Sequence, residues 1–106
     1  MQRWAVPPEL LSDVKNQLNI TWEDQATDNK YRGLIALAST YIDGKAGQAM
    51  DYEEDGLARQ LLFEYVRYAR DEALDVFENN YLSLILSLQN QNKVDAYVEK
   101  AGQAQE

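Results

Sequence analysis

The chain has 106 residues, the size of one small domain, and it carries 18 acidic against 10 basic side chains for a net charge of −8. It contains no cysteine and no histidine, which excludes disulfides, thiolate chemistry and imidazole metal ligands and removes the commonest general base. The acidic balance makes tight binding of free nucleic acid unfavourable, because affinity for phosphates comes from lysine and arginine. We find neither a secretory signal pattern nor a run of apolar residues long enough to span a membrane, so a cytosolic protein is the first expectation.

The segment from Pro8 to about Leu18 has the pattern of a short amphipathic helix. Leu11, Val14 and Leu18 share one helical face, and proline is tolerated in the first turn, where its missing N–H has no partner in any case. Asn19 can end this helix. We expect Trp22, in the acidic turn that follows, to fill the corner between this helix and the next.

A second helix is indicated by apolar residues at helical spacing. They are Tyr31, Leu34, Ile35, Ala38, Tyr41 and Ile42. The start of this helix stays open, because Thr21 and Asp28 are both suitable N-caps. Gly44 suits its C-terminal end.

Residues 46–55 are predicted to form a loop with four carboxylates in five positions. These are Asp51, Glu53, Glu54 and Asp55. Paired carboxylates can perform acid–base chemistry, they can bind a divalent cation, or they can be solvated charges of an exposed loop. We favour the third interpretation, with Asp55 also stabilising the positive N-terminus of the next helix.

The stretch from Gly56 to about Leu88 is the centre of the predicted fold, because it has no proline and no further glycine and keeps one apolar helical face. A second apolar group lies beside that face and consists of Leu57, Leu61, Tyr65 and Tyr68. A helix that is apolar over so much of its girth needs partners on two sides. Two readings stay open: the central helix of a small helical domain, or a helix that also lines a subunit interface through these four residues. Whether the helix continues past Asn79-Asn80 is open as well, and residues 81–88 also fit an alternating strand, although we favour a helix there.

The end of the chain is expected to hold a separate short helix. Gln89, Asn90, Gln91 and Asn92 form a polar break, and beyond it Val94, Tyr97, Val98 and Ala101 make one apolar stripe. An isolated two-turn helix is marginal in water and gains order by docking into a groove on another copy or another protein.

Together these patterns predict an all-α fold, a small bundle of about four helices with one long central helix and a short C-terminal helix or tail. Residues 1–89 are expected to form the helical domain and residues 90–106 the tail. No phosphate-binding glycine loop, nucleophile elbow, metal box or dinucleotide fingerprint is present in the sequence. We therefore expect neither an enzyme nor a protein with a cofactor or metal.

The order of features resembles the head–tail connector (adaptor or head-completion) proteins of tailed bacteriophages and related prophage elements. The resemblance covers roughly residues 9–89 and is carried by hydrophobic patterns rather than by catalytic residues. Its strongest matches are V-K-x-x-L-x-I at Val14–Ile20, the pair Tyr41-Ile42, and YVRYARDEALDVFENNY at Tyr65–Tyr81.

This resemblance implies a virion structural protein at the head–tail interface, present in the host cytoplasm during assembly. Copies would form a ring, with twelve as the expected number, that binds the portal protein, extends the DNA channel without binding DNA specifically, and supports the next connector, stopper or tail-completion protein. By analogy, Val94, Tyr97, Val98 and Ala101 are the candidate portal contact. Asp51, Glu53, Glu54 and Asp55 are candidates for the channel wall, where negative charge would keep DNA from sticking.

A second function class stays open: a small acidic inhibitor, or DNA mimic, that binds a basic protein surface. A mimic should present carboxylates at regular, phosphate-like spacing over one face, whereas the acidic residues here are scattered along the sequence. Oligomeric state separates the two classes, because such an inhibitor is usually a monomer or a dimer.

Overall fold

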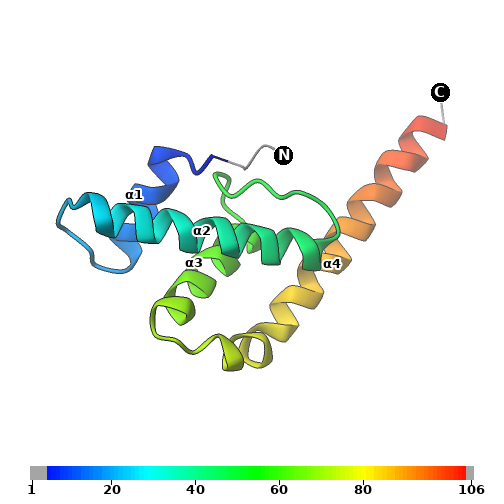
Figure 1. Ribbon diagram of the computed structural model, residues 1–106. Helices are drawn as coiled ribbons and strands as arrows, with labels where there is room; N and C mark the ends of the chain where they lie inside the picture. The colour runs from blue at the N-terminus through cyan, green and yellow to red at the C-terminus, as the bar shows by residue number, and fades with distance from the viewer. Residues whose placement is uncertain (1–4, 105–106) are drawn as a thin grey trace.

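The computed structural model describes residues 5–104, with side chains described as far as Val98, and that part of the chain is helical without a strand (Figure 1). Its helices are α1 (Pro8–Gln17), α2 (Gln25–Ala46), α3 (Leu57–Arg70) and α4 (Leu74–Ala104). The predicted all-α fold with about four helices is confirmed.

Helix α1 begins with proline in its first turn, as predicted. It ends at Gln17, and two residues later Asn19 adopts the left-handed conformation, with φ of 60°. The N–H of Ile20 bonds to the carbonyl of Lys15 at 2.8 Å, which closes the last turn. Leu18 and Ile20 are buried and fill the corner towards α2. The prediction for Trp22 was wrong, because these two residues take its place and leave it 55% exposed.

Helix α2 is bounded by residues other than those considered from the sequence. Its N-cap is Asp24, whose carboxylate accepts hydrogen bonds from the backbone N–H of Thr27 at 3.1 Å and from its hydroxyl at 2.8 Å. These bonds lower the pKa of Asp24 below its ordinary value. At the other end Gly47, with φ of 78°, ends the helix three residues beyond Gly44. The predicted inward face is confirmed, since Tyr31, Ile35, Ala38 and Ile42 are buried.

The stretch expected as one long helix consists of two helices, α3 and α4. Between them Glu72 has φ of 56°, and the N–H groups of Glu72 and Ala73 bond to the carbonyls of Ala69 at 3.1 Å and Tyr68 at 2.8 Å. This is the Schellman pattern that ends a helix, normally with glycine at the left-handed position. Because a glutamate stands there, the sequence carried no sign of the break. The two helices turn back on each other (Figure 1).

The long helix of the fold is α4, whose 31 residues span about 46 Å. It runs without interruption through positions 89–92, so the predicted polar break and the separate short C-terminal helix were wrong. The amides in question bond to the C-terminal carbonyls of α2: Gln89 Nε2 to Lys45 O at 2.8 Å, and Asn92 Nδ2 to Ala46 O at 3.3 Å. Polar side chains here join two helices instead of ending one.

An aromatic cluster closes α3 and α4 onto α2. Its centre is Phe77, which is 2% exposed and packs with ring centroids 5.1 to 5.9 Å from its neighbours. Those neighbours are Tyr41 from α2, Tyr65 and Tyr68 from α3, and Tyr81 from α4. Such edge-to-face and stacked pairs contribute stability beyond that of the area they bury. The cluster therefore holds the first turns of α4 against α2 and α3.

Ion pairs tie α1 to the rest of the body. Lys15 Nζ lies 2.7 Å from Asp28 of α2, and Arg59 Nη2 of α3 lies 2.6 Å from Asp13. Arg59 also donates to the backbone carbonyl of Tyr52 at 2.9 Å, so it anchors the loop before α3. Lys15, Asp28 and Arg59 are mostly buried and Asp13 is half-buried, so these pairs are screened less by solvent than ion pairs on the surface.

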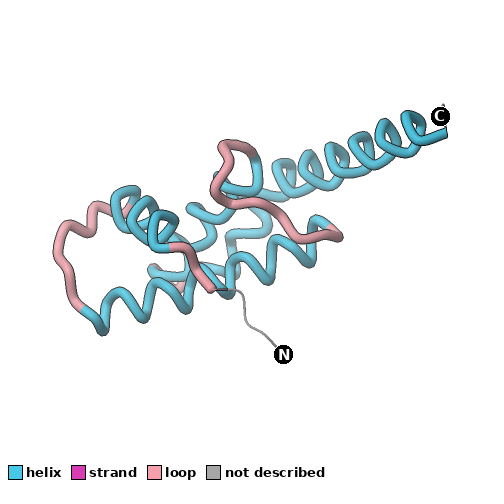
Figure 2. The backbone as a smooth tube through the Cα atoms, turned by 90° about the horizontal axis from the view of Figure 1, so that it is seen from above, coloured by secondary structure: helices cyan, strands magenta, loops and turns pink. Residues whose placement is uncertain are grey.

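The molecule is elongated, with extents of 53, 29 and 26 Å. The cause is α4, whose C-terminal part projects beyond the other helices in both views (Figures 1 and 2). None of the described helices is long and apolar enough to cross a membrane.

Candidate functional site

The projecting part of α4 presents the apolar residues singled out from the sequence. Every described side chain from Lys93 to Val98 is exposed, and Val94, Tyr97 and Val98 expose 51%, 74% and 62% of their surface. Ala101 belongs to α4, but its side chain lies outside those described. Exposed apolar residues grouped on one helix mark a surface that another protein can cover.

A second exposed apolar surface on α4 was missed from the sequence. Leu82 and Leu86, one turn apart on the side away from the core, expose 47% and 53% of their surface. Ser83 and Ser87 beside them are also exposed. The signal was available, because positions 79–92 contain no charged residue in a chain that is 26% charged. What could not be read from the sequence was which side of this run faces the body.

The four residues proposed for a subunit interface are engaged inside the chain. Leu61 is 1% exposed and belongs to the core, so it is not available to a partner, and Leu57 is half-buried. Tyr65 and Tyr68 are half-buried against Phe77 of α4. The turn at Glu72 folds α4 back onto α3, so that α4 of the same chain is the partner of Tyr65 and Tyr68.

The acidic loop is solvent-facing, because Asp51, Glu53, Glu54 and Asp55 are all exposed. Asp51 Oδ1 accepts the N–H of Glu53 at 2.9 Å, and Asp55 lies 3.8 Å from Arg59. Within the described part of the chain, no three acidic residues come together as metal ligands. Solvated loop charges remain the interpretation that the geometry supports.

Tyrosine hydroxyls connect the helices through carboxylates. Tyr41 donates to Glu78 Oε1 at 2.9 Å and Tyr81 donates to Glu64 Oε2 at 2.9 Å. Burial is the main cause that raises the pKa of each tyrosine to about 12, and the hydrogen bond to the carboxylate is the second cause. Bonds from Lys45 and Tyr41 lower the pKa of Glu78. Such tyrosines stay protonated at neutral pH, so they act as donors that hold helices together.

The described side chains offer three candidate surfaces for binding another molecule. Their distinguishing features are the projecting helix end, the uncharged outer side of α4 and the exposed acidic loop. Comparison of the chain with protein-family models, with curated proteins and with solved structures finds no match.

Proposed function

We propose that the protein is a structural ring component of a tailed-phage virion, at the head–tail interface, where it binds the portal and extends the DNA channel. The observation that carries the proposal is the end of α4, which leaves the body after Asn92 and exposes Val94, Tyr97 and Val98. A helix end without packing neighbours is marginal in water and gains stability when its apolar side is covered. A portal groove is the cover that the connector resemblance suggests.

The rest of the molecule suits this role. An acidic, helical body with an exposed carboxylate loop can face passing DNA without retaining it. We place Asp51, Glu53, Glu54 and Asp55 on the channel wall of a ring of twelve, with a further connector, stopper or tail-completion protein on the opposite side. Imaging of the assembled ring tests this placement, and a channel lined mainly by lysine and arginine contradicts it.

The same exposed loop favours one alternative, a small acidic inhibitor or DNA mimic that binds a basic protein surface. The four carboxylates lie within five consecutive positions of one loop rather than at intervals along a face. A phosphate-like array needs repeated spacing, so the ring is the better supported proposal.

Native mass decides between them. The protein is measured alone and after mixing with its candidate portal, by native mass spectrometry and light scattering. A ring-sized mass in either state supports the connector. A monomer in both states overturns it and leaves the inhibitor.

The docking surface is tested by the triple variant Val94→Ser, Tyr97→Ser and Val98→Ser. We expect it to lose at least about tenfold in portal affinity, because three apolar contacts are removed, with no loss of thermal stability. Trp22→Ser is the matched control, since it removes another exposed large apolar side chain, distant in sequence. Wild-type portal binding by the triple variant would exclude this surface.

A further inference from the structure

One side of α2 faces away from the core and is suited to close approach by another helix. It consists of Gly33, Leu37, Thr40 and Gly44, which recur at helical spacing and are all exposed, Leu37 by 60%. A Cβ built at Gly33 or Gly44 meets nothing within 4 Å, so packing inside the chain does not require glycine there. Each glycine costs a helix interior about 1 kcal/mol relative to alanine. We call this side the α2 outer face.

The outer side of α4 carries protruding side chains, in contrast to the mostly small residues of the α2 outer face. Leu82 and Leu86 stand out from it beside the small side chains of Ser83 and Ser87. We call these four residues the α4 outer face. Protruding leucines on one helix and small residues around a single leucine on another are the complementary surfaces that helices use when their side chains interdigitate.

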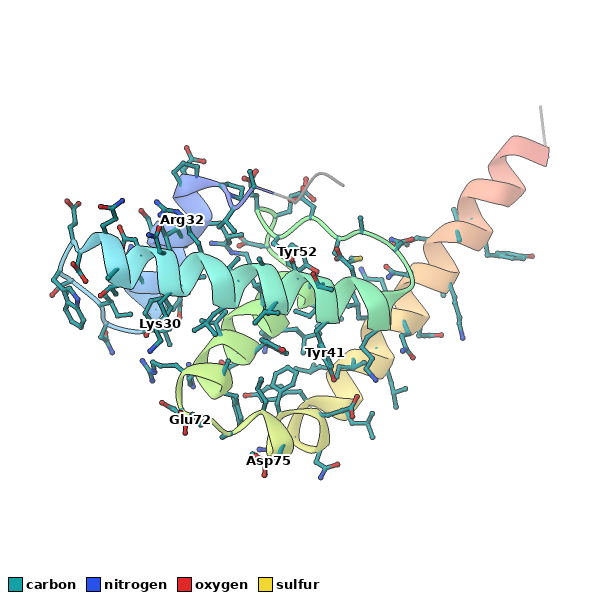
Figure 3. All side chains as sticks on the ribbon, viewed as in Figure 1. Lys30, Arg32, Tyr41, Tyr52, Glu72 and Asp75 are labelled. Atoms are coloured by element: carbon teal, nitrogen blue, oxygen red, sulfur yellow. The ribbon has the colours of Figure 1, made fainter. Side chains whose placement is uncertain are left out.

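Both outer faces carry opposite charge at their N-terminal ends. Lys30 precedes Leu37 by seven residues, and Asp75 precedes Leu82 by seven residues, about 10.5 Å in each case. Glu72 adds negative charge near Asp75, whereas Arg32 lies on the opposite side of α2 from Lys30 (Figure 3). All four side chains are exposed.

Lys30, Glu72 and Asp75 have no ionic partner in the described part of the chain. When the two outer faces are aligned in parallel with Leu82 against Leu37, Asp75 comes opposite Lys30. An antiparallel alignment on the same leucines places Lys30 opposite the uncharged region near Gln89 and loses the ion pair.

We infer that the α2 outer face of one copy binds the α4 outer face of the next copy, with the helices parallel and Lys30 paired with Asp75. The occupant is a second copy because the chain carries both halves of the charge match, and because acidic copies repel each other except where uncharged faces meet. The two faces differ, so the contact is heterologous and leaves one free face at each end. Repetition of such a contact closes into a ring when its rotation permits. This inference rests on the proposed ring and supplies its subunit contact.

Charge exchange tests the pairing. Lys30→Glu, Asp75→Lys and the double variant are compared by native mass spectrometry and by sedimentation at graded concentration, under the condition in which the wild type forms its ring. We expect each single variant to weaken association by about tenfold or more, and the double variant to restore it. Glu9→Lys, an equal charge change on α1, should leave association unchanged.

A steric variant separates association from folding. Gly44→Leu adds a side chain where the protomer has open space, and it replaces a poor helix former with a good one. The protomer should unfold at the same or a higher temperature, while ring formation is lost. A ring that persists in Gly44→Leu and in both single charge variants overturns this contact but leaves the ring proposal standing. Failure of the double variant to restore association overturns the Lys30–Asp75 pairing, whereas absence of a wild-type ring, alone and with portal, overturns the proposed function itself.

Discussion

At the scale of the residue, Tyr52 holds the acidic loop against α2. Its hydroxyl donates to Asp43 Oδ1 at 2.5 Å and lies 3.2 Å from the carbonyl oxygen of Ser39, while its ring is 3% exposed. Tyr52→Phe removes a buried, charge-assisted hydrogen bond and leaves the ring in place. We expect a loss of about 1 to 3 kcal/mol in the free energy of unfolding, measured by urea denaturation. Tyr97→Phe, on an exposed ring, is the control, and equal stability of both variants contradicts the assignment.

Two half-buried tyrosines, Tyr41 and Tyr81, also predict how stability depends on pH. Tyr41 and Tyr81 have folded pKa values of about 12 against an ordinary value of 10.0. A folded pKa above the unfolded one stabilises the protein fully below pH 10, and this stabilisation is lost as the pH rises towards 12. The melting temperature should therefore fall steeply over that interval, together with the rise of phenolate absorbance. Tyr41→Phe should flatten the fall, and an unchanged slope would contradict it.

Residue patterns predicted which side chains of α2 are buried, because a helix that lies on a core repeats its apolar residues with the helical period. Trp22 shows where this reasoning stops. Whether a large aromatic side chain in a turn is buried depends on which neighbouring side chains occupy the same space. Here Leu18 and Ile20 are buried and Trp22 is exposed. Such competition is decided in three dimensions and leaves no local trace in the sequence.

At the scale of the element, the turn at Glu72 determines how α4 lies on α3. A non-glycine residue in the left-handed region carries strain of roughly 1 to 2 kcal/mol, part of which glycine loses again through its greater freedom in the unfolded chain. Glu72→Gly should therefore stabilise the protein by about 0.5 to 1 kcal/mol in urea denaturation.

Gly47→Ala is the converse case. Its Cβ meets nothing within 4 Å, yet its φ of 78° is unfavourable for alanine, so we expect a loss of about 1 kcal/mol. The two substitutions exchange glycine and a non-glycine residue at helix C-termini in opposite directions. Effects of the same sign in both would contradict the argument.

Helix content could be predicted from the sequence, but helix ends could be predicted only in part. Asn19 was recognised as an end because asparagine tolerates the left-handed region, whereas a glutamate in the same role at position 72 gave no such signal. Gln89 and Asn92 led to the opposite error, because a helix end was predicted where α4 continues. Their polarity is typical of a break, but it serves the unpaired carbonyls at the end of α2.

At the scale of the whole molecule, the body and the projecting helix end should be separable. Removal of residues 93–106 takes away a segment whose described side chains are all exposed, so we expect the free energy of unfolding to change by about 0.5 kcal/mol or less. Leu88→Ala, 2% exposed within the body, should cost about 2 to 5 kcal/mol. Urea denaturation measures both, and a truncated chain as unstable as Leu88→Ala would show that the end of α4 supports the fold.

The candidate surfaces were predictable to different degrees. Val94, Tyr97 and Val98 could be found because apolar residues on a polar tail have no partner nearby in the sequence. Tyr65 and Tyr68 could not be recognised as inward-facing rather than interface residues, because Phe77 of α4 reaches them only after the unpredicted turn at Glu72.

The projecting end of α4 has a consequence for binding strength. One copy offers three described apolar side chains, a contact area too small for tight binding by a single helix. A ring offers one such helix from every subunit, and once the first has docked, the others bind at high effective concentration. A partner whose rotational symmetry matches the ring would then be held by avidity, whereas a single free copy would be released quickly. Selection for complete rings would follow from geometry alone.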